Sequence, residues 1–320
     1  PYNSSPEQQY HNTRYPIDTN NIIRYTTPER WCMMKDYSHY PVNTDVYLAG
    51  AEQKCEILID GFRYIMKFQK NSEVGLTFNH VSEFLGSHVF ALLNIPVQET
   101  FLGTYQGKNV VLMKHFCLPG ERLVPFNDIG ESTLEQDKEL YQYSYEDIEQ
   151  MLKDNTKNTD VAETIHRFWD MFIVDALNGN FDRHGGNWGF IRKKNSYRIA
   201  PVYDNGSCMY PKLNTDKTLL EVLRSDEEIM RRIYTFPTSH IKLDGKKSSY
   251  YNIISGLRFK ECNDALARIV PRIDLNAINN LIDSIDGISD TRKRFYKTMY
   301  EQRYTQILLA SYEKLMTTTT

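Results

Sequence analysis

The sequence predicts an α+β fold with two lobes, a small antiparallel sheet with one helix followed by a mainly helical lobe. Strand-like alternation with turn signals fills the first third of the chain, and a helical period of about 3.6 residues dominates beyond it. This order is typical of α+β folds rather than of alternating parallel sheets. We therefore expect an irregular arm over 1–45, a sheet lobe over 46–116 and a helical lobe over 117–320, with the ligand site in the cleft between the lobes.

Composition excludes several classes of protein. At 320 residues the chain is long enough for about two domains. Apolar residues make up 41% and charged residues 25%, as in folded globular proteins, and no run approaches the roughly 20 apolar residues of a membrane-spanning helix. The 38 basic and 41 acidic residues give a net charge of -3 without a basic stripe. We therefore expect no nucleic-acid partner and no integral membrane association.

Cysteine usage and the first residues bear on location. The 5 cysteines are widely spaced and form no Cys-x-x-Cys pair, which indicates a reducing compartment. The first residues lack the basic start and apolar core of a Sec-type signal. We expect the cytoplasm by default, with export by another route left open.

The first hairpin places a lysine on a regular strand. Cys55–Ile59 and Phe62–Phe68 are alternating runs separated by Asp60-Gly61, which is a strong hairpin signal. Successive strand side chains point to opposite faces, so Lys67 projects away from the face that carries the aromatic side chains.

A helix and a second hairpin complete the predicted sheet lobe. Apolar residues recur at helical spacing over 81–93, and Glu83 lies within this helix. Strand-like runs at 97–103 and 109–116 then flank a short turn.

The helical lobe has clear start and stop signals. Ser144 and Asp147 form an S-x-x-D capping box. A long helix over 161–177 is closed by Asn178-Gly179. The remaining elements are a strand pair at 188–191 and 197–202, and helical patterns over 217–315 that end in a tyrosine-rich helix after Asp290.

Polar residues concentrate in the glycine-rich segment after the long helix. Asp182 and Asn187 stand 187 − 182 = 5 residues apart, the spacing with which a kinase catalytic loop presents a carboxylate to the substrate hydroxyl and an amide oxygen to Mg²⁺. Asp204 follows the strand pair, where it can bind metal from the opposite wall. Mg²⁺ prefers hard oxygen ligands, so the set fits phosphoryl transfer. Taken singly, each residue has a plainer interpretation as a turn or loop cap.

Cationic residues that can hold phosphates precede this segment. Lys67 can reach phosphates as a point charge, and Glu83 can pair with it, although either side chain alone can equally be a solvated surface group.

His184 is either an assisting base or phosphate stabiliser, or a structural partner that holds the loop. The candidate phosphate-covering loop lies just before the first strand and contributes Gly50, Ala51 and Lys54.

Together these motifs resemble those of the HipA-like serine/threonine kinases, a bacterial family. The likeness rests on the Ala49–Lys54 run, the Met66–Phe68 strand, the Asp182–Asn187 loop and the Ala200–Asp204 segment, in that order. The compact length is similar to the short HipA-like type called cell-translocating kinase. The resemblance implies a bilobal protein-kinase-like or PI3-kinase-like fold that uses ATP and Mg²⁺ to phosphorylate serine and threonine hydroxyls of proteins, itself included.

The resemblance also implies roles for single residues. Lys67 would contact the nucleotide phosphates, Asp182 would be the catalytic base, and Asn187 and Asp204 would bind Mg²⁺. The hinge that holds adenine by backbone groups would comprise Met113, Lys114, His115 and Phe116.

Two features depart from the family's pattern. Tyr47 stands where HipA-type proteins carry a serine that is autophosphorylated to inactivate the enzyme. The arm is also too short for the HipA N-terminal region, so antitoxin docking and operator binding are not expected.

Other functions stay open at this point. Asp182-Arg183-His184-x-x-Asn187 also matches the catalytic loop of phosphoinositide kinases, so phosphatidylinositol is the competing acceptor. The absence of a polybasic or amphipathic membrane segment disfavours it. A pseudokinase that binds nucleotide and serves as a docking module is a further alternative, although the metal ligands and the base are all present. The sequence leaves the acceptor protein and the oligomeric state undetermined.

Overall fold

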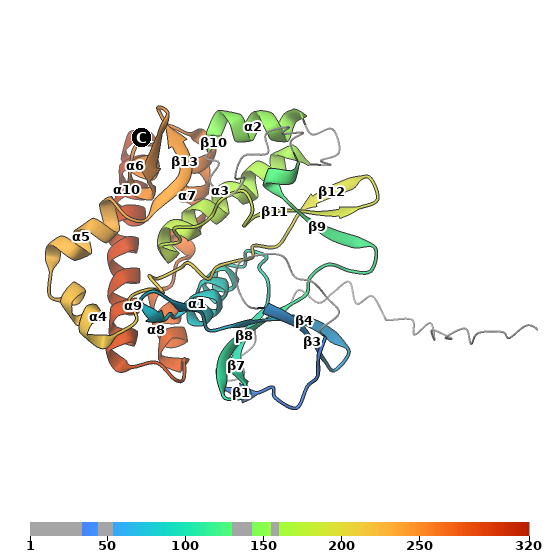
Figure 1. The fold of residues 1–320 in the computed structure, drawn as a ribbon. Helices are drawn as coiled ribbons and strands as arrows, with labels where there is room; N and C mark the ends of the chain where they lie inside the picture. The colour runs from blue at the N-terminus through green and yellow to red at the C-terminus, as the bar shows by residue number, and fades with distance from the viewer. Residues whose placement is uncertain (1–33, 44–53, 130–142, 155–159, 320) are drawn as a thin grey trace, which may run out of the picture.

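The computed structural model describes residues 34–43, 54–129, 143–154 and 160–319. Figure 1 shows a sheet on one side of the molecule and a larger group of helices with smaller sheets on the other. Helix α1 (Asn79–Leu92) lies between the two parts.

The largest sheet has six strands. In order across the sheet they are β1 (Lys35–Asp36), β7 (Thr100–Tyr105), β8 (Lys108–Lys114), β4 (Phe62–Phe68), β3 (Lys54–Ile59) and β2 (Val42–Asn43). Neighbouring strands are antiparallel except β1, which runs parallel to β7. We expected a purely antiparallel sheet, but the sheet is mixed. Part of the stretch predicted to be irregular adds one short strand to each edge, and one of these strands, β1, is parallel to its neighbour.

The register of the first hairpin decides where its lysines point. Lys54 lies opposite Lys67 across β3 and β4, and Cys55 lies opposite Met66. Met66 is fully buried with Ile57 in an apolar cluster on one face of the sheet. Lys67 therefore lies on the other face, as the alternation predicted, and Lys54 shares that face.

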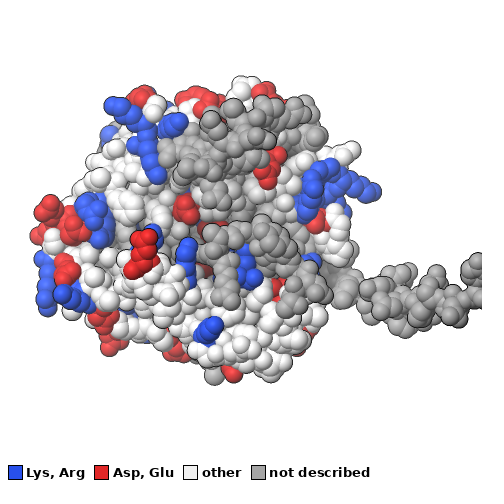
Figure 2. Space-filling model, in the orientation of Figure 1, with Lys and Arg blue, Asp and Glu red and all other residues white. Residues whose placement is uncertain are grey.

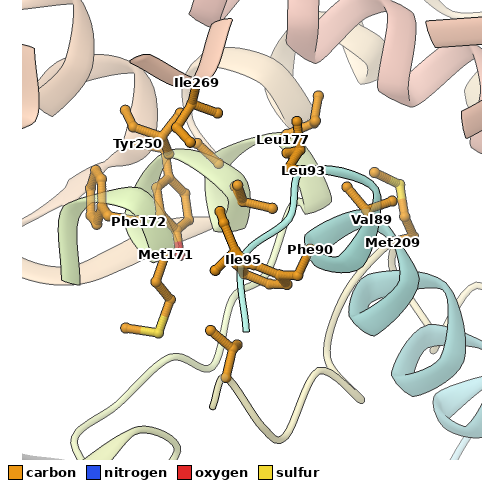
Figure 3. Packing of buried hydrophobic residues seen from close by; sticks show 14 of the residues in the cluster. Val89, Phe90, Leu93, Ile95, Met171, Phe172, Leu177, Met209, Tyr250 and Ile269 are labelled. Carbon is orange, nitrogen blue, oxygen red and sulfur yellow. The ribbon is translucent and has the colours of Figure 1, made fainter. Parts of the chain in front are cut away.

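Helix α1 is buried along nearly its whole length. Of its 14 residues only the last is not buried, because the sheet covers one side and helices α3 (Val161–Asn178) and α8 (Leu275–Ser284) cover others. Figure 3 shows Val89 and Phe90 of α1 in the same apolar cluster as Leu177 of α3. One continuous core thus joins the sheet side to the helical side.

The caps of the long helix follow the sequence signals. The Asp160 side chain accepts a hydrogen bond from Glu163 N–H at 2.8 Å, and Gly179 ends the helix with a left-handed φ of 60°. The predicted capping box is also present, since Asp147 N–H donates to Ser144 Oγ at 3.1 Å and Ser144 N–H donates to Asp147 Oδ2 at 3.0 Å. The capping box at Ser144 and the glycine stop were predicted from the sequence, whereas the Asp160 cap was not singled out.

Further helical elements belong to the larger part of the molecule. They are α2 (Tyr145–Asp154), α4 (Asp216–Leu223), α5 (Asp226–Tyr234), α6 (Tyr250–Ser255), α7 (Lys260–Ile269), α9 (Asp290–Arg303), a π-helical segment η4 (Tyr304–Leu309), α10 (Ala310–Thr319), and the short 3₁₀ turns η2 (Phe126–Asp128) and η3 (Val270–Arg272). Of these, α2, α6, α7, α9 and η4 contact α3. Among the residues that the structure describes, every helix is too short or too polar to span a bilayer.

Small sheets interrupt the region expected to be mainly helical. One contains β12 (Ser196–Ile199), β11 (Gly189–Lys193) and β9 (Glu121–Pro125); another contains β10 (Tyr143–Ser144), β13 (Thr238–Leu243) and β14 (Lys246–Ser249); a third pairs β5 (Asn71–Ser72) with β6 (Gly75–Leu76). The hairpin of β13 and β14 was not predicted, although Asp244 and Gly245 form its turn with φ values of 51° and 75°. An Asp-Gly turn of this kind was a readable signal.

Candidate active site

Lys67 lies where the sheet, helix α1 and the segment after β12 meet. Its Nζ is 3.2 Å from Glu83 Oε2 and 3.1 Å from Asp204 Oδ1. Only 9% of the Lys67 side chain and 1% of the Glu83 side chain are exposed. Charge-assisted bonds are stronger in such a poorly solvated setting. The structure thus brings together three predicted site residues, of which Lys67 and Asp204 are 137 positions apart.

The two carboxylates differ in their surroundings. Glu83 Oε1 accepts a hydrogen bond from Asn205 N–H at 2.8 Å. Burial raises the pKa of Glu83 above its ordinary value, and the attraction of Lys67 only partly offsets this. Burial also acts to raise the pKa of Asp204, but the combined attraction of Lys67, Arg183 and Lys54, in which Lys67 has the largest share, holds this pKa below its usual range. The Asp204 side chain is 39% exposed, so it is the one that can reach a ligand.

The backbone around Asp204 is fixed from two sides. Val202 N–H donates to Pro96 O at 2.9 Å, and Gln98 N–H donates to Val202 O at 2.8 Å. Asp204 itself has a left-handed φ of 57°. Such a conformation costs about 1–3 kcal/mol in a residue other than glycine and persists where the surroundings impose it. The hydrogen-bonded turn begins one residue later, where Cys208 N–H donates to Asn205 O at 3.1 Å, and the Asp204 carboxylate lies beside Lys67 Nζ.

The segment from Asp182 to Asn187 forms a closed loop. Asn187 Nδ2 donates to Asp182 O at 2.8 Å, and Asp182 N–H donates to Asn180 Oδ1 at 3.0 Å. The amide nitrogen of Asn187 is thus used inside the loop. The Asp182 side chain is 46% exposed. The loop therefore presents a carboxylate to the surface while its backbone is held.

His184 has a structural contact within this loop. Its Nδ1 accepts a hydrogen bond from Gly186 N–H at 3.0 Å, and its Nε2 lies 3.9 Å from Asp182 Oδ1. With Nδ1 as the acceptor, the proton of the neutral ring lies on Nε2, which faces Asp182. The structural alternative for His184 therefore has direct support, and a role in phosphate transfer stays a prediction.

Arg183 was not singled out from the sequence, yet it joins the parts of the site. Its guanidinium binds both oxygens of Asp175 on α3, at 2.7 and 3.0 Å. It also donates to Asn187 O at 2.7 Å, to Tyr203 O at 2.5 Å and to Asn205 Oδ1 at 2.5 Å. The loop and the Asp204 segment are thus anchored to one side chain.

Arg183 and Asp175 are held as an ion pair in the core. The Arg183 side chain is 5% exposed and that of Asp175 is 1% exposed. Burial acts to lower the pKa of Arg183, but the attraction of Asp175 outweighs it, and the pKa is raised above the ordinary value. The readable signal was Asp175 itself, because an acidic residue on the apolar stripe of a buried helix requires a cation.

The predicted phosphate-covering loop lies partly outside the described residues. Gly50 and Ala51 belong to the stretch that the structure does not describe. Lys54 begins β3 opposite Lys67, and its charge helps to lower the pKa of Asp204, after the larger effect of Lys67. Lys54 is therefore close to the site.

The predicted hinge is divided between a strand and the connection that follows it. Met113 is buried in β8, and the neighbouring Lys114 N–H donates to Glu99 O at 2.9 Å. The Lys114 ammonium also binds the Glu99 carboxylate at 3.0 Å. The backbone N–H of Lys114 is thus engaged in the sheet, that of His115 donates to Arg63 O at 2.8 Å, and the adenine contact at this hinge stays a prediction. There Phe116 packs against Tyr203, with ring centroids 6.1 Å apart.

The described fold and site define the class of the protein. A sheet with one packed helix, a buried lysine–glutamate pair that also contacts Asp204, and an arginine that joins the Asp182–Asn187 loop to the Asp204 segment are the parts of a kinase-type phosphotransferase. The model of the family described as HipA-like C-terminal domain matches residues 46–285. The chain belongs to this HipA-like family, which confirms the resemblance.

One curated relative and one solved structure agree with this assignment. The serine/threonine-protein kinase CtkA of Helicobacter pylori (strain J99 / ATCC 700824) is 37% identical over 281 residues, which cover 85% of this chain and 86% of the relative. The crystal structure of the proinflammatory kinase CtkA of Helicobacter pylori matches with a TM-score of 0.81 at 35% identity, over 88% of this chain and 99% of that one. The chain is accordingly an enzyme, a protein kinase.

A more distant structure shares the fold alone. HipA of the Shewanella oneidensis MR-1 toxin–antitoxin system, solved with HipB and operator DNA, matches with a TM-score of 0.55 at 17% identity. The match covers 84% of this chain and 66% of HipA. The expected kinase-like fold is thus confirmed, with small sheets that are mixed.

Proposed function

We propose that the chain transfers the γ-phosphate of ATP to serine or threonine hydroxyls of a protein, in the cleft between lobes 46–116 and 117–320. The contact of Lys67 with both Glu83 and Asp204 carries this proposal, because it holds the lysine ammonium in place for the nucleotide phosphates and brings it to the Asp204 segment, which Arg183 joins to the Asp182 loop. The 37% identical relative is a serine/threonine-protein kinase, which supports serine and threonine as acceptors. The protein itself is one such acceptor.

Lys67 and Lys54 neutralise the phosphates of the nucleotide. Their positions opposite each other put both ammonium groups on one face of the sheet. Like charges directly opposite each other in a sheet disfavour each other, so bound phosphates relieve this repulsion. Glu83 holds Lys67 extended from α1, at 3.2 Å. The nucleotide is thereby positioned with little rearrangement of the protein.

Asn187 and Asp204 would hold Mg²⁺ through one amide oxygen and one carboxylate. These are the hard oxygen donors that Mg²⁺ prefers. Within the described ranges no three His, Cys, Asp or Glu side chains gather into a metal cluster, so we expect a site that two protein oxygens share with the nucleotide. When bound, the ion adds positive charge beside the transferred phosphate. Arg183 positions both ligands through Asn187 O and, at 3.3 Å, Asp204 O.

Asp182 acts as the base toward the acceptor. Its carboxylate is 46% exposed, so the hydroxyl of a protein chain can approach it. The hydroxyl oxygen forms a bond to the γ-phosphorus as its proton passes to Asp182, and the bond from that phosphorus to the bridging oxygen of ADP breaks. General base catalysis contributes about 10²–10⁴-fold to a rate.

The decisive experiment compares acceptors and variants. The protein is incubated with labelled Mg-ATP alone, with generic serine/threonine substrates, and with phosphoinositide vesicles. Asp182→Asn and Asp204→Asn should each lose at least about 100-fold of the protein labelling. Asp283→Asn, an exposed carboxylate paired with Lys297 on the surface, is the matched control and should keep it.

Each alternative has its own outcome in this experiment. Label confined to the vesicles would show a phosphoinositide kinase. ATP binding without transfer to any acceptor would show a pseudokinase. Undiminished labelling in both aspartate variants would show that the site is elsewhere.

A further inference from the structure

The strand β13 runs beside the catalytic loop. His240 Nε2 lies 3.3 Å from Phe181 O, and the rings of His240 and His184 are 5.8 Å apart. His184 Nε2 in turn lies 3.9 Å from Asp182 Oδ1. A short path of side chains thus leads from the proposed base to the hairpin of β13 and β14.

This hairpin carries three lysines. Lys242 lies opposite Lys247, and Lys246 lies opposite Leu243. Its acidic residue is Asp244 in the turn, and Arg258 binds both Asp244 oxygens at 2.9 and 3.2 Å. Figure 2 shows Lys and Arg side chains gathered over the place that Figure 1 gives to this hairpin. We call Lys242, Lys246 and Lys247 the lysine hairpin.

The charge of the lysine hairpin affects His240, which lies between the hairpin and the Asp182 loop. Burial, and then the charge of Lys247, lower the pKa of His240 to about 4, so this ring is neutral at pH 7. The positive charge beside this part of the Asp182 loop therefore comes from the three lysines and not from His240. Because the whole chain has a net charge of -3, this is a local feature and not an effect of overall charge.

We propose that the lysine hairpin binds acidic side chains of the protein substrate, about three to five residues from the phosphorylated hydroxyl. This inference rests on the proposed function and names the substrate class that it acts on. The distance follows from the path of 3.9 and 5.8 Å between Asp182 and His240, since an extended chain advances about 3.3 Å per residue. The lysines lie beyond His240 along this path.

The surface of the hairpin favours an acidic peptide over a lipid membrane. The large exposed apolar residues of the described chain include none from the hairpin. Peripheral membrane binding normally combines cationic residues with inserted apolar ones. Binding of acidic side chains requires only the positive charges of the lysines.

A charge reversal with a matched control tests the proposal. Lys246→Glu/Lys247→Glu reverses two charges on the lysine hairpin. Lys193→Glu/Lys194→Glu makes the same change of charge on the hairpin of β11 and β12, which lies on the other side of the molecule in Figure 1. The substrates are two peptides with the same single serine. At the third to fifth positions before and after this serine, one peptide has aspartate and the other has lysine.

The wild type should show a KM at least about tenfold lower for the aspartate peptide, with kcat little changed. Lys246→Glu/Lys247→Glu should reverse this order, and the control variant should keep it. Raising the ionic strength from 0.05 to about 0.5 M should weaken the preference, because exposed charges are screened. Equal KM values for both peptides in the wild type, or the same reversal in the control variant, would overturn the proposal.

Binding without turnover separates this proposal from the proposed function. Fluorescence anisotropy measures both labelled peptides on Asp182→Asn, which retains the lysine hairpin. Tighter binding of the aspartate peptide without phosphorylation by the wild type would support the hairpin and count against the kinase reaction. Phosphorylation of both peptides with no difference in binding or KM would support the kinase reaction and count against the role of the lysine hairpin. Phosphoinositide vesicles that lose their labelling in Lys246→Glu/Lys247→Glu, while neither peptide is labelled, would assign the hairpin to lipid and refute the acidic peptide.

Discussion

Replacing Arg183 with methionine should cost about 3–5 kcal/mol of stability, because it leaves a buried carboxylate without its cation. The Asp175 side chain is 1% exposed and would keep only Asn180 Nδ2, at 3.0 Å, among the partners shown for its carboxylate. The carbonyls of Asn187 and Tyr203 would also lose their shared donor.

The expected change in melting temperature follows from the size of the protein. Unfolding entropy of about 2.1 cal/mol/K per residue gives roughly 0.7 kcal/mol/K for 320 residues. A loss of about 3–5 kcal/mol therefore lowers Tm by about 4–7 °C. Arg258→Met removes an ion pair whose side chains are 52% and 73% exposed, and should change stability by no more than about 1 kcal/mol.

A double variant separates stability from function. Asp175→Leu/Arg183→Met removes both charges, so most of the lost stability should return. Activity should not return, because the loop and the Asp204 segment still lack their common anchor. Thermal unfolding followed by circular dichroism gives Tm, and kcat/KM with a serine peptide gives activity. An unchanged Tm in Arg183→Met, or full activity in the double variant, would refute the reasoning.

Three further predictions concern helix α1 and its neighbours. Gly86→Ala should lower stability by about 1–3 kcal/mol although alanine favours helices, because its Cβ would stand 2.9 Å from Asn205 Cβ; a Tm above that of the wild type would contradict this close packing. Burial lowers the pKa of His88 to about 4, whereas histidine titrates near pH 6.5 in the unfolded chain, which therefore binds more protons between these values. Stability should fall as pH drops from about 6.5 toward 4, by up to about 1.4 kcal/mol per pH unit, and Tm values at pH 5 and 7 should differ less in His88→Gln. Lys67→Ala should reduce kcat/KM more than Glu83→Ala, since Lys67 keeps Asp204 as a partner when Glu83 is absent; an equal or greater loss in Glu83→Ala would give the glutamate a direct role.

Elements that depend on neighbouring residues were predictable. The Asp60-Gly61 turn, the capping box at Ser144 and the glycine that closes α3 act over a few positions, and the structure contains each of them. The short edge strands β1 and β2 were not predicted, because two-residue strands form only where a partner strand offers hydrogen bonds. The hairpin of β13 and β14 carried its Asp-Gly signal within a region read as helical.

The sequence by itself determined which side chains are the candidates for the chemistry. Lys67, Asp182, Asn187 and Asp204 were identified by residue type, order and spacing, which are properties of the chain alone. Only the tertiary structure decided which residues they contact. Lys67 bridges Glu83 and Asp204, while Arg183 joins α3 to the loop and to the segment after β12. Contacts between residues 137 positions apart depend on how the helices and the sheet pack, and no local pattern records that packing.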